Sequence, residues 1–293
     1  MDTTGTTVTS SFDPVAEHAR TRAALAAAVP RLVRLLKAVP DAGAPSGVPD
    51  WTVGDVAAHL AAASLAYGSA VGAEDDLDWA ALLPPGDDLS FAERVTAVNA
   101  TALTLFGPDE RAGLPGFLAE RAESFLEATE GLAPDTPVTT PWYGPGVAVT
   151  LATVTGLMLS ETLVHGLDIA RGARLPWSIG PEEAGLVIGQ SMPTMMALAL
   201  DEEKARGVSL AVDLVVRGGG PRLAVVVDGG AMTVTRDAAP RPYDCRLTVE
   251  PRAFLLVAFR RAPRWKAIAS GRMRAGGRRP WLATRLADLV AGP

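Results

Sequence analysis

The pattern of hydrophobic residues changes once along this chain of 293 residues, near residue 207. Before that point, apolar residues recur at helical spacing over long segments. After it come short segments rich in β-branched residues, separated by glycine-rich turns, at 208–216, 222–227, 231–235 and 245–249. A run of helices followed by a run of strands indicates two domains. The sequence therefore predicts a helical domain over residues 12–206 and a smaller α+β domain over residues 207–293.

Capping and breaking residues set the limits of the expected helices. These helices are expected over 15–38, 52–71, 91–106, 115–129, 150–171, 181–206, 251–260 and 281–290. Pro30 lies inside the first of them and predicts a kink or break. Thr52 is a good cap for the second helix, and Asp55 completes a weak capping box. Gly172 is expected to end the helix over 150–171 as its C-cap.

Composition excludes several classes of function. The chain is 48% hydrophobic and carries a formal charge of -6, so nucleic acid is not an expected partner. Cys245 is the only cysteine, which excludes an internal disulfide and a cysteine-based metal cluster. The sequence shows no secretory signal and no apolar run of the roughly 20 residues that a membrane span needs. We therefore expect a cytoplasmic protein without membrane contact, monomeric or homodimeric, and its Ala, Gly, Arg and Pro content is typical of GC-rich bacteria.

Glu161 and His165 are four residues apart in an apolar helical segment, and His59 lies in a second such segment. Positions i and i+4 share one face of a helix, so the carboxylate and the imidazole can reach the same small cation. Two nitrogens and one carboxylate from two helices match the ligands of a catalytic zinc site, with a fourth position left for water or substrate. The alternative is that each histidine is a partly buried, hydrogen-bonded residue without a metal.

Two aspartates are spaced to act as outer partners of these histidines: Asp55 at i−4 to His59 and Asp168 at i+3 to His165. The third histidine, His18, is expected at the surface. Cys245 is interpreted as a small strand residue rather than a nucleophile. The arginine-rich run over 260–279 is interpreted as a solvated face that can also present one or two guanidiniums to an anionic substrate.

The two histidine motifs together resemble the mycothiol-dependent maleylpyruvate isomerase family. They read Trp51-Thr52-Val53-x-Asp55-x-x-x-His59-Leu60 and Glu161-x-x-x-His165-Gly166-x-Asp168. The resemblance implies a DinB-like four-helix bundle followed by a smaller sterol-carrier-like α+β domain. It also implies Zn²⁺, or another divalent metal, at His59, Glu161 and His165, with mycothiol as thiol cosubstrate. Family members use arginines to hold substrate carboxylates, and the candidates by position are Arg94, Arg272 and Arg274.

The function implied by this resemblance begins with a thiol whose pKa a metal lowers. The thiolate then attacks a small anionic or electrophilic substrate of the maleylpyruvate type. Cis–trans isomerisation follows if the thiol is expelled again, and S-transfer if it is retained. Two alternatives stay open: a metal-site tailoring enzyme of secondary metabolism that uses no thiol, and a non-catalytic binding module in which apolar helices and methionines enclose an apolar ligand.

Overall fold

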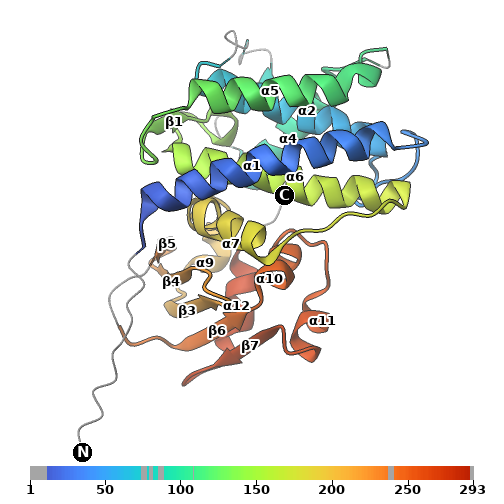
Figure 1. Ribbon diagram of the computed structural model, residues 1–293. Coiled ribbons are helices and arrows are strands. Elements are labelled where there is room, and N and C mark those ends of the chain that lie inside the picture. The colour runs from blue at the N-terminus through green and yellow to red at the C-terminus, as the bar shows by residue number, and fades with distance from the viewer. Residues whose placement is uncertain are drawn as a thin grey trace, which may run out of the picture.

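The chain combines a layer of helices with a layer built on a sheet (Figure 1). The computed structural model describes residues 12–73, 78, 82–84, 89–107, 109–236 and 241–290. The long helices of the first layer are α1 (Pro14–Lys37), α2 (Val53–Ala70), α5 (Leu114–Ala128) and α6 (Leu151–Ala173). Both α1 and α2 pack against α5 and against α6. The mixed helical and sheet composition expected from the sequence is therefore present.

Helix α1 begins at a side-chain cap and runs through a proline. The Asp13 carboxylate accepts hydrogen bonds from two backbone N–H groups of the first turn, which have no partner within the helix. A kink or a break is expected at Pro30, and the helix continues across it to its end. A break is therefore excluded, and the kink stays a prediction. Ala28 and Leu32 flank the proline and are 0% and 2% exposed. Their packing offsets the hydrogen bond that the proline cannot make.

Helix α2 begins as its sequence predicts. The Thr52 side chain accepts a hydrogen bond from the backbone N–H of Asp55, and the Asp55 carboxylate accepts one from the backbone N–H of Thr52. This reciprocal pair is a capping box, which satisfies two N–H groups at the helix start. The cap fixes where the helix starts and therefore which residues face α6.

Helix α6 extends through its expected C-cap. Gly172 lies inside the helix, and Arg174 adopts the left-handed conformation just beyond its end (φ 58°). A Cβ added at Gly172 would lie 2.4 Å from the carbonyl oxygen of Pro45. The glycine therefore permits the close approach of a loop and does not end the helix. The backbone N–H of Gly47 in that loop donates to the carbonyl of Asp168 at 2.9 Å.

The second layer contains a five-stranded sheet in the order β5-β4-β3-β6-β7. Its strands are β3 (Leu210–Val216), β4 (Arg222–Asp228), β5 (Ala231–Arg236), β6 (Cys245–Val249) and β7 (Met273–Gly276). Strand β3 pairs in parallel with β6, and the other neighbours are antiparallel. The first four strands match the predicted segments. Strand β7 is not among them, because its four residues are too few to show an alternating pattern.

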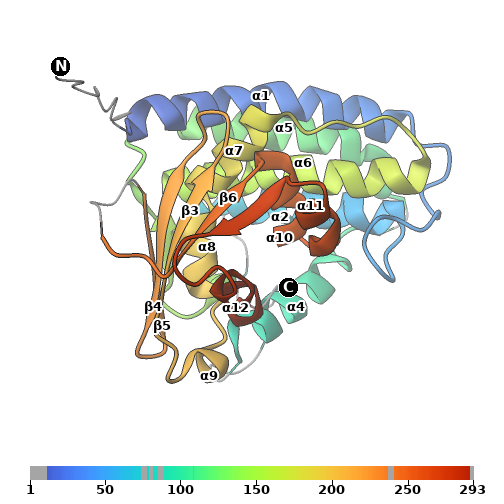
Figure 2. The same ribbon diagram turned by 90° about the horizontal axis from the view of Figure 1, so that it is seen from below.

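Helices lie beside this sheet, as Figure 2 shows. They are α7 (Pro181–Gln190), α8 (Met192–Leu198), α9 (Glu202–Ala205), α10 (Pro251–Ala258), α11 (Arg264–Ala269) and α12 (Leu282–Leu289). The single helix predicted over 181–206 is wrong, because the structure divides it into α7, α8 and α9. Pro193 follows directly after the first break, and a proline suits the first turn of a new helix rather than the interior of an old one.

Shorter elements complete the helical layer. They are α4 (Phe91–Ala102), the 3₁₀ helices η1 (Arg111–Gly113) and η2 (Pro141–Tyr143), and the antiparallel strands β1 (Pro137–Thr139) and β2 (Ala148–Thr150). Helix α4 packs against α2 and η2. The predicted helices over 91–106 and 115–129 correspond to α4 and α5.

Apolar packing joins the two layers. One hydrophobic cluster contains Leu159 and Leu163 of α6, Val187 of α7, and Val212 and Leu214 of β3, all 0% exposed. The sheet layer therefore packs onto the same helix that carries Glu161 and His165, and burial of this apolar area stabilises their relative placement. Among the described helices, none combines the length and the apolar character that crossing a bilayer requires.

Candidate metal centre

Three side chains from two helices meet inside the helical layer. Helix α2 carries His59, and α6 carries Glu161 and His165 one turn apart on the same face. One ligand atom from each of the three lies within 4.8 Å of the others. The imidazole rings of His59 and His165 stand nearly at right angles, with centroids 4.8 Å apart and an interplanar angle of 74°. The structure brings together the three residues that the sequence singled out as ligands.

The Glu161 carboxylate bridges the two imidazoles. Its Oε2 atom lies 3.3 Å from His59 Nε2 and 3.2 Å from His165 Nε2. The Glu161 side chain is 24% exposed, compared with 10% for His59. A carboxylate on an otherwise buried helix face therefore has both nitrogen partners and access to solvent, which together offset the cost of its burial.

Asp168 and Arg261 fix the orientation of His165. The Asp168 side chain is 0% exposed, and its Oδ2 lies 3.0 Å from His165 Nδ1. The Arg261 guanidinium donates to the same carboxylate at 2.6 Å from Nη2 and 3.0 Å from Nε. In the neutral ring, a carboxylate that accepts from Nδ1–H leaves the lone pair on Nε2, the nitrogen directed at the centre. The predicted outer partnership of Asp168 is confirmed.

The other histidine lacks such a partner. His59 Nδ1 is buried and has no hydrogen-bond partner among the described residues. Asp55 does not fill this place: its carboxylate caps α2 through Thr52 and pairs with Arg111 at 2.9 Å. The predicted outer partnership of Asp55 with His59 is therefore wrong, because the capping box engages the carboxylate. The indole of Trp51 packs against the His59 ring, with centroids 5.3 Å apart.

The protonation of the centre follows from these contacts. Burial opposes the ionisation of Glu161, but hydrogen bonds from His165 and His59 outweigh it and hold the pKa of Glu161 far below its usual range. Burial lowers the pKa of His165, yet its hydrogen bonds to Asp168 and Glu161 prevail and raise that pKa to about 9. Without a metal, the centre is therefore a carboxylate beside an imidazolium. A divalent cation held by His165 Nε2 would have to replace that proton, since metal ligands must be deprotonated.

Two tyrosines lie beside the centre. The Tyr67 and Tyr143 hydroxyls are 3.2 Å apart. Burial is the main reason that the pKa of both phenols is raised, and that of Tyr143 reaches about 12. The negative charge of Glu161 raises both pKa values further. Both groups are therefore protonated phenols at neutral pH, able to donate hydrogen bonds.

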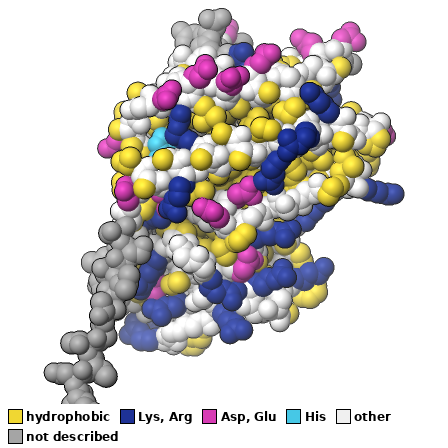
Figure 3. All heavy atoms as spheres, viewed as in Figure 1, with side chains coloured by type: hydrophobic (Ala, Val, Ile, Leu, Met, Phe, Trp, Pro, Cys, Tyr) yellow, Lys and Arg dark blue, Asp and Glu magenta, His cyan; other side chains and the backbone are white. Residues whose placement is uncertain are grey.

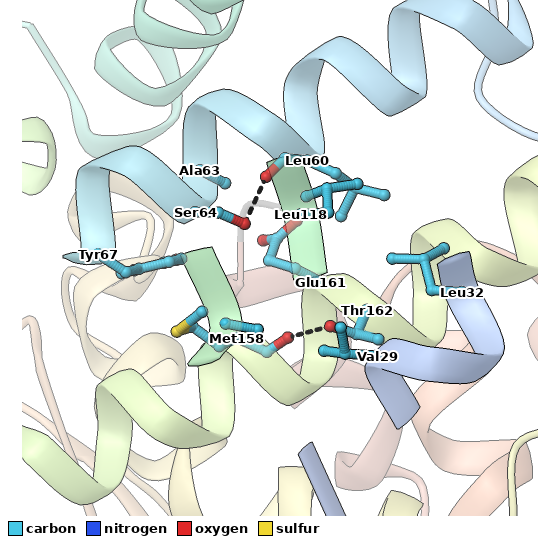
Figure 4. A pocket seen from close by; sticks show the side chains of 11 residues that line it. Val29, Leu32, Leu60, Ala63, Ser64, Tyr67, Leu118, Met158, Glu161 and Thr162 are labelled. Atoms are coloured by element: carbon cyan, nitrogen blue, oxygen red, sulfur yellow. Dashed lines mark hydrogen bonds between the residues drawn. The ribbon is translucent and has the colours of Figure 1, made fainter. Parts of the chain in front are cut away.

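A small cavity adjoins Glu161. Figure 4 shows the Glu161 carboxylate directed from α6 toward the helix that carries Leu60 and Ser64. The cavity has a volume of about 20 Å³ and is walled mostly by apolar residues such as Met158 and Leu118. This is room for one water molecule. A larger group bound at the centre has to lie on its solvent-accessible side.

The donor set fits a divalent metal. Two imidazole nitrogens and one carboxylate oxygen are the protein ligands of many catalytic zinc sites, which keep a fourth position for water or substrate. His165 also has the carboxylate partner typical of metal-bound histidines. His59 Nδ1 departs from that pattern. With Nε2 of both rings directed at Glu161, the three residues present fit such a group.

The three candidate arginines lie in different places. Arg94 is 4% exposed within α4. Arg272 and Arg274 are exposed on either side of Met273, where β7 lies on the opposite side of the molecule from α2 (Figure 1). Their part in holding a substrate carboxylate stays a prediction.

Two other singled-out residues are buried. His18 is 4% exposed and its Nε2 hydrogen-bonds Thr155 Oγ1 at 3.0 Å, so the expected surface position is wrong. The sequence neighbours of His18 are polar and indicate a solvent-facing position, but in the structure this side of α1 packs against α6. Cys245 is 1% exposed in β6, and burial raises the pKa of its thiol. It has the character of a structural strand residue.

A family model matches residues 22–170, which is half of the chain and includes all three candidate ligand residues. The model is that of the mycothiol maleylpyruvate isomerase N-terminal domain. The chain belongs to this family. The family resemblance carried by the two histidine motifs is thereby confirmed. No curated protein matches the chain.

Solved structures similar to this member of the family include the mycothiol-dependent maleylpyruvate isomerase, at 15% identity and a TM-score of 0.47 over 88% of this chain and 92% of that one. A mutant of that isomerase gives 14% identity and the same TM-score. The sec-alkylsulfatase Pisa1 from Pseudomonas sp. gives 14% identity and a TM-score of 0.32. The match to the sulfatase covers 49% of this chain and 25% of the sulfatase chain, so this chain spans about a quarter of that protein's length.

Arg261 is a residue of the candidate site that the sequence did not single out. Its side chain is 16% exposed, although the run over 260–279 is interpreted from sequence as a solvated face. Nothing in the local sequence separates Arg261 from its basic neighbours. The only available signal is indirect, because a buried Asp168 requires a cationic partner from elsewhere in the chain.

Proposed function

We propose that this chain is a metal-dependent enzyme that uses mycothiol as a nucleophile on a small electrophilic substrate of the maleylpyruvate type. The supporting observation is the convergence of His59, Glu161 and His165 within 4.8 Å. Membership of the maleylpyruvate isomerase family supports an enzymatic role. The cytoplasmic location and the monomeric or homodimeric state stay predictions from the sequence.

The proposed architecture divides the chain into two parts. Residues 12–206 form a DinB-like domain whose bundle consists of α1, α2, α5 and α6, and residues 207–293 form a smaller sterol-carrier-like domain. The mutual packing of those helices supports the first assignment. The β3–β7 sheet with α10, α11 and α12 supports the second.

In this proposal His59 Nε2, the Glu161 carboxylate and His165 Nε2 hold Zn²⁺ or another divalent metal. A metal bound there supplies a Lewis acid that lowers the pKa of a thiol, so that thiolate persists at neutral pH. Asp168 holds the His165 ring in the tautomer that presents Nε2, and Arg261 holds Asp168. The chain itself supplies no thiol to the centre, since its only cysteine lies in β6.

The chemical steps require only a thiolate and an electron-poor alkene. The thiolate sulfur adds to one alkene carbon of a conjugated cis substrate, and the electron pair moves onto the conjugated carbonyl as an enolate. The former double bond then rotates. When the enolate collapses, it expels the thiolate and leaves the trans alkene. S-transfer results if the enolate is instead protonated and the thioether retained.

Protein groups assist by charge and orientation. The Tyr67 and Tyr143 phenols, which lie beside Glu161 and stay protonated at neutral pH, can donate hydrogen bonds to developing negative charge. Arg94, Arg272 and Arg274 are the proposed holders of substrate carboxylate, for which the guanidinium fork is suited.

The metal assignment is tested by elemental analysis and turnover of the same samples. Wild-type protein is expected to retain about one zinc per chain and to convert maleylpyruvate only when mycothiol is present. His165→Ala removes one of three ligands and should lose both properties. His18→Gln is the matched control, because it alters another buried histidine and should keep them. Full mycothiol-dependent turnover by zinc-free His165→Ala protein would refute the proposal.

Product analysis separates the two reaction types. An isomerase returns mycothiol unchanged and yields the trans acid, so catalytic amounts of thiol suffice. A transferase consumes one thiol for each product formed. Turnover that needs no thiol at all would favour a tailoring enzyme on the same scaffold.

A further inference from the structure

Basic and acidic side chains are separated along this chain. Residues 251–293 contain ten of the 27 Lys and Arg residues but only one of the 33 Asp and Glu residues, Asp288. The formal charge of -6 therefore combines a strongly basic C-terminal segment with an acidic remainder. Figure 3 shows Lys and Arg side chains gathered over the lower, sheet-bearing part of the molecule, whereas Asp and Glu side chains lie mainly over the helical layer. Charge of one sign gathered on one part of a surface favours a partner of the opposite sign.

Three large apolar side chains are exposed within the same segment. Trp265 and Ile268 of α11 are 66% and 52% exposed, and Trp281, the N-cap residue of α12, is 65% exposed. A single exposed apolar residue is ordinary, but a group of them on one surface marks an interaction site. Indoles also suit a boundary between water and an apolar phase, because the apolar ring carries one polar N–H group.

These side chains belong to one face of the molecule. Arg264, Ile268 and Pro280 line one large cavity of about 810 Å³, to which α8, α10, α12 and β7 also contribute. Trp265 and Trp281 each directly follow one of these lining residues. Figure 2, which views the molecule from below, shows β7, α11 and α12 in front of the helical layer. We define the tryptophan face as the exposed residues Arg264, Trp265, Lys266, Ile268, Arg278, Arg279 and Trp281.

The arginines of the tryptophan face are only weakly paired within the protein. Arg278 and Arg279 approach the same oxygen of Asp244 at 4.0 and 3.6 Å, with side chains 71% and 59% exposed. Arg264 approaches Asp288 at 3.8 Å, and both side chains are exposed. Ion pairs this long and this exposed contribute little to stability. These cations can therefore bind external anions at little cost to the fold.

We propose that the tryptophan face binds the surface of an anionic lipid bilayer. The two indoles and Ile268 lie at the boundary between headgroups and acyl chains, and the surrounding Arg and Lys side chains pair with lipid phosphates. The acidic helical layer then points away from the bilayer, where salt screens its repulsion beyond about 10 Å. The expected absence of membrane contact rests on the lack of a spanning run in the sequence, and binding at a bilayer surface requires no such run.

A bilayer fits this face better than a nucleic acid, the other common polyanion. Nucleic acids also pair phosphates with Arg and Lys, and single strands stack their bases on indoles. An exposed aliphatic side chain such as Ile268 gains little from phosphates or bases, whereas it loses contact with water on entering a bilayer interface. The metal centre takes no part in this binding, so the proposal stands or fails independently of the thiol-dependent reaction.

Vesicle sedimentation with the full-length protein tests the proposal. One set of vesicles contains phosphatidylcholine alone, and the other contains phosphatidylcholine and phosphatidylglycerol in equal amounts. Binding to the anionic vesicles is expected to be tighter by about tenfold or more and to shift the tryptophan emission to shorter wavelength. It should weaken when the salt concentration is raised to about 1 M. Equal binding to both sets, or no binding to either, would overturn the proposal.

Charge reversal locates the contact. Lys266→Glu combined with Arg279→Glu reverses two cations of the tryptophan face, so the affinity for anionic vesicles should fall by about tenfold or more. Arg34→Glu combined with Lys37→Glu is the matched control, because it changes the net charge equally at exposed residues of α1 in the helical layer. This control should bind as the wild type does. An equal loss in both double variants would mean that net charge alone governs binding, which contradicts the assignment of this face.

Trp265→Ala combined with Trp281→Ala tests the apolar contribution. Both indoles are exposed, so the Tm should stay close to that of the wild type while vesicle affinity falls by about tenfold. Leu132→Ala truncates another apolar residue, 45% exposed and just beyond α5, and this control should bind normally. Wild-type vesicle binding by the folded tryptophan variant would contradict the proposal. If that variant does not fold, the charge reversal still decides.

A nucleic-acid probe completes the experiment. Fluorescence anisotropy with a labelled single-stranded oligothymidylate measures its affinity in the same buffer as the vesicles. Weaker binding than to the anionic vesicles is expected. Tighter binding of the oligonucleotide, lost in the tryptophan variant, would assign the face to nucleic acid and refute the bilayer proposal.

Discussion

At the metal centre each charged side chain has an opposite charge beside it, whereas around the large cavity two arginines have none among the described residues. Glu161 lies between two imidazoles, and Asp168 lies between His165 and Arg261. Arg260 and Arg274 instead border apolar walls. A closed network holds its members in one geometry, which suits a small ion with fixed ligand directions. Arginines without a carboxylate partner in the protein can still form charge-assisted hydrogen bonds with an anion that binds there.

The largest expected effect comes from opening the closed network at Asp168. Asp168→Ala leaves the Arg261 guanidinium and a protonated His165 close together without their shared counter-charge. The free energy of unfolding should fall by about 3–5 kcal/mol, as for other buried pairs that lose one partner. Urea denaturation of metal-free protein measures it. A loss below about 1 kcal/mol would mean that the network is as weak as an exposed ion pair. The contrast between paired charges here and unpaired arginines at the large cavity would then have no energetic basis.

The next effect concerns the metal. Arg261→Ala frees Asp168 to rotate, so the His165 ring loses its fixed orientation and zinc affinity should fall by about 10–100-fold. Arg261→Lys keeps one charge and should recover part of the loss. Competition with a chromogenic chelator gives the affinity. Arg252→Ala, which removes an exposed arginine of α10, is the control and should change nothing.

Packing on α6 and α7 is compared by adding the same methyl group to each. A Cβ at Gly166 would lie 2.3 Å from the Trp177 ring, whereas one at Gly185 would meet nothing within 4 Å. Gly166→Ala should lower the free energy of unfolding by about 1–3 kcal/mol, since the indole is held by its N–H bond to the Leu163 carbonyl. Gly185→Ala should raise it by about 0.5–1 kcal/mol. Similar values for both variants would show that α6 tolerates repacking beside His165.

The smallest effect concerns a buried aspartate in the sheet. Asp213 of β3 is 1% exposed and pairs with Arg222 and Arg246, whose side chains are about half exposed. Burial opposes its ionisation, but these arginines outweigh burial and lower the pKa of Asp213. Its stabilisation is thus present above the unfolded pKa of about 3.9 and is lost as pH falls through the lower folded value. Asp213→Asn should be less stable than wild type at pH 7 and approach it at acidic pH, measured by denaturation. A constant difference would exclude this source of stability.

Sequence spacing predicted the local features well. The i, i+4 pair of Glu161 and His165 and the capping box of Thr52 and Asp55 both depend on residues within one or two turns, and the structure has both. Asp55 also shows the limit of such reasoning. Its spacing allows two partners, His59 and the backbone N–H of Thr52, and in the structure it binds Thr52. Sequence spacing alone does not predict which of two possible partners a carboxylate binds.

Apart from the meeting of His59 with Glu161 and His165, features that depend on distant segments are not predicted from the sequence. Arg261 reaches Asp168 across 93 residues of sequence, and the pattern of the basic run gives no sign of it. The sequence predicts a surface position for His18 from its polar neighbours, whereas Thr155 of α6 supplies a buried hydrogen-bond partner. The large cavity likewise arises from α8, α10, α11, α12 and β7 together. Tertiary packing creates each of these features.

The contact between Arg261 and Asp168 has a consequence for biosynthesis. All three proposed ligands have been translated once residue 165 is added, but the arginine that secures Asp168 comes 93 residues after it. At roughly 5–20 residues per second, the ribosome needs about 5–20 s to supply it. Until then Asp168 lacks the guanidinium that it pairs with in the folded protein, so the network that orients the His165 ring is completed only by the C-terminal part of the chain.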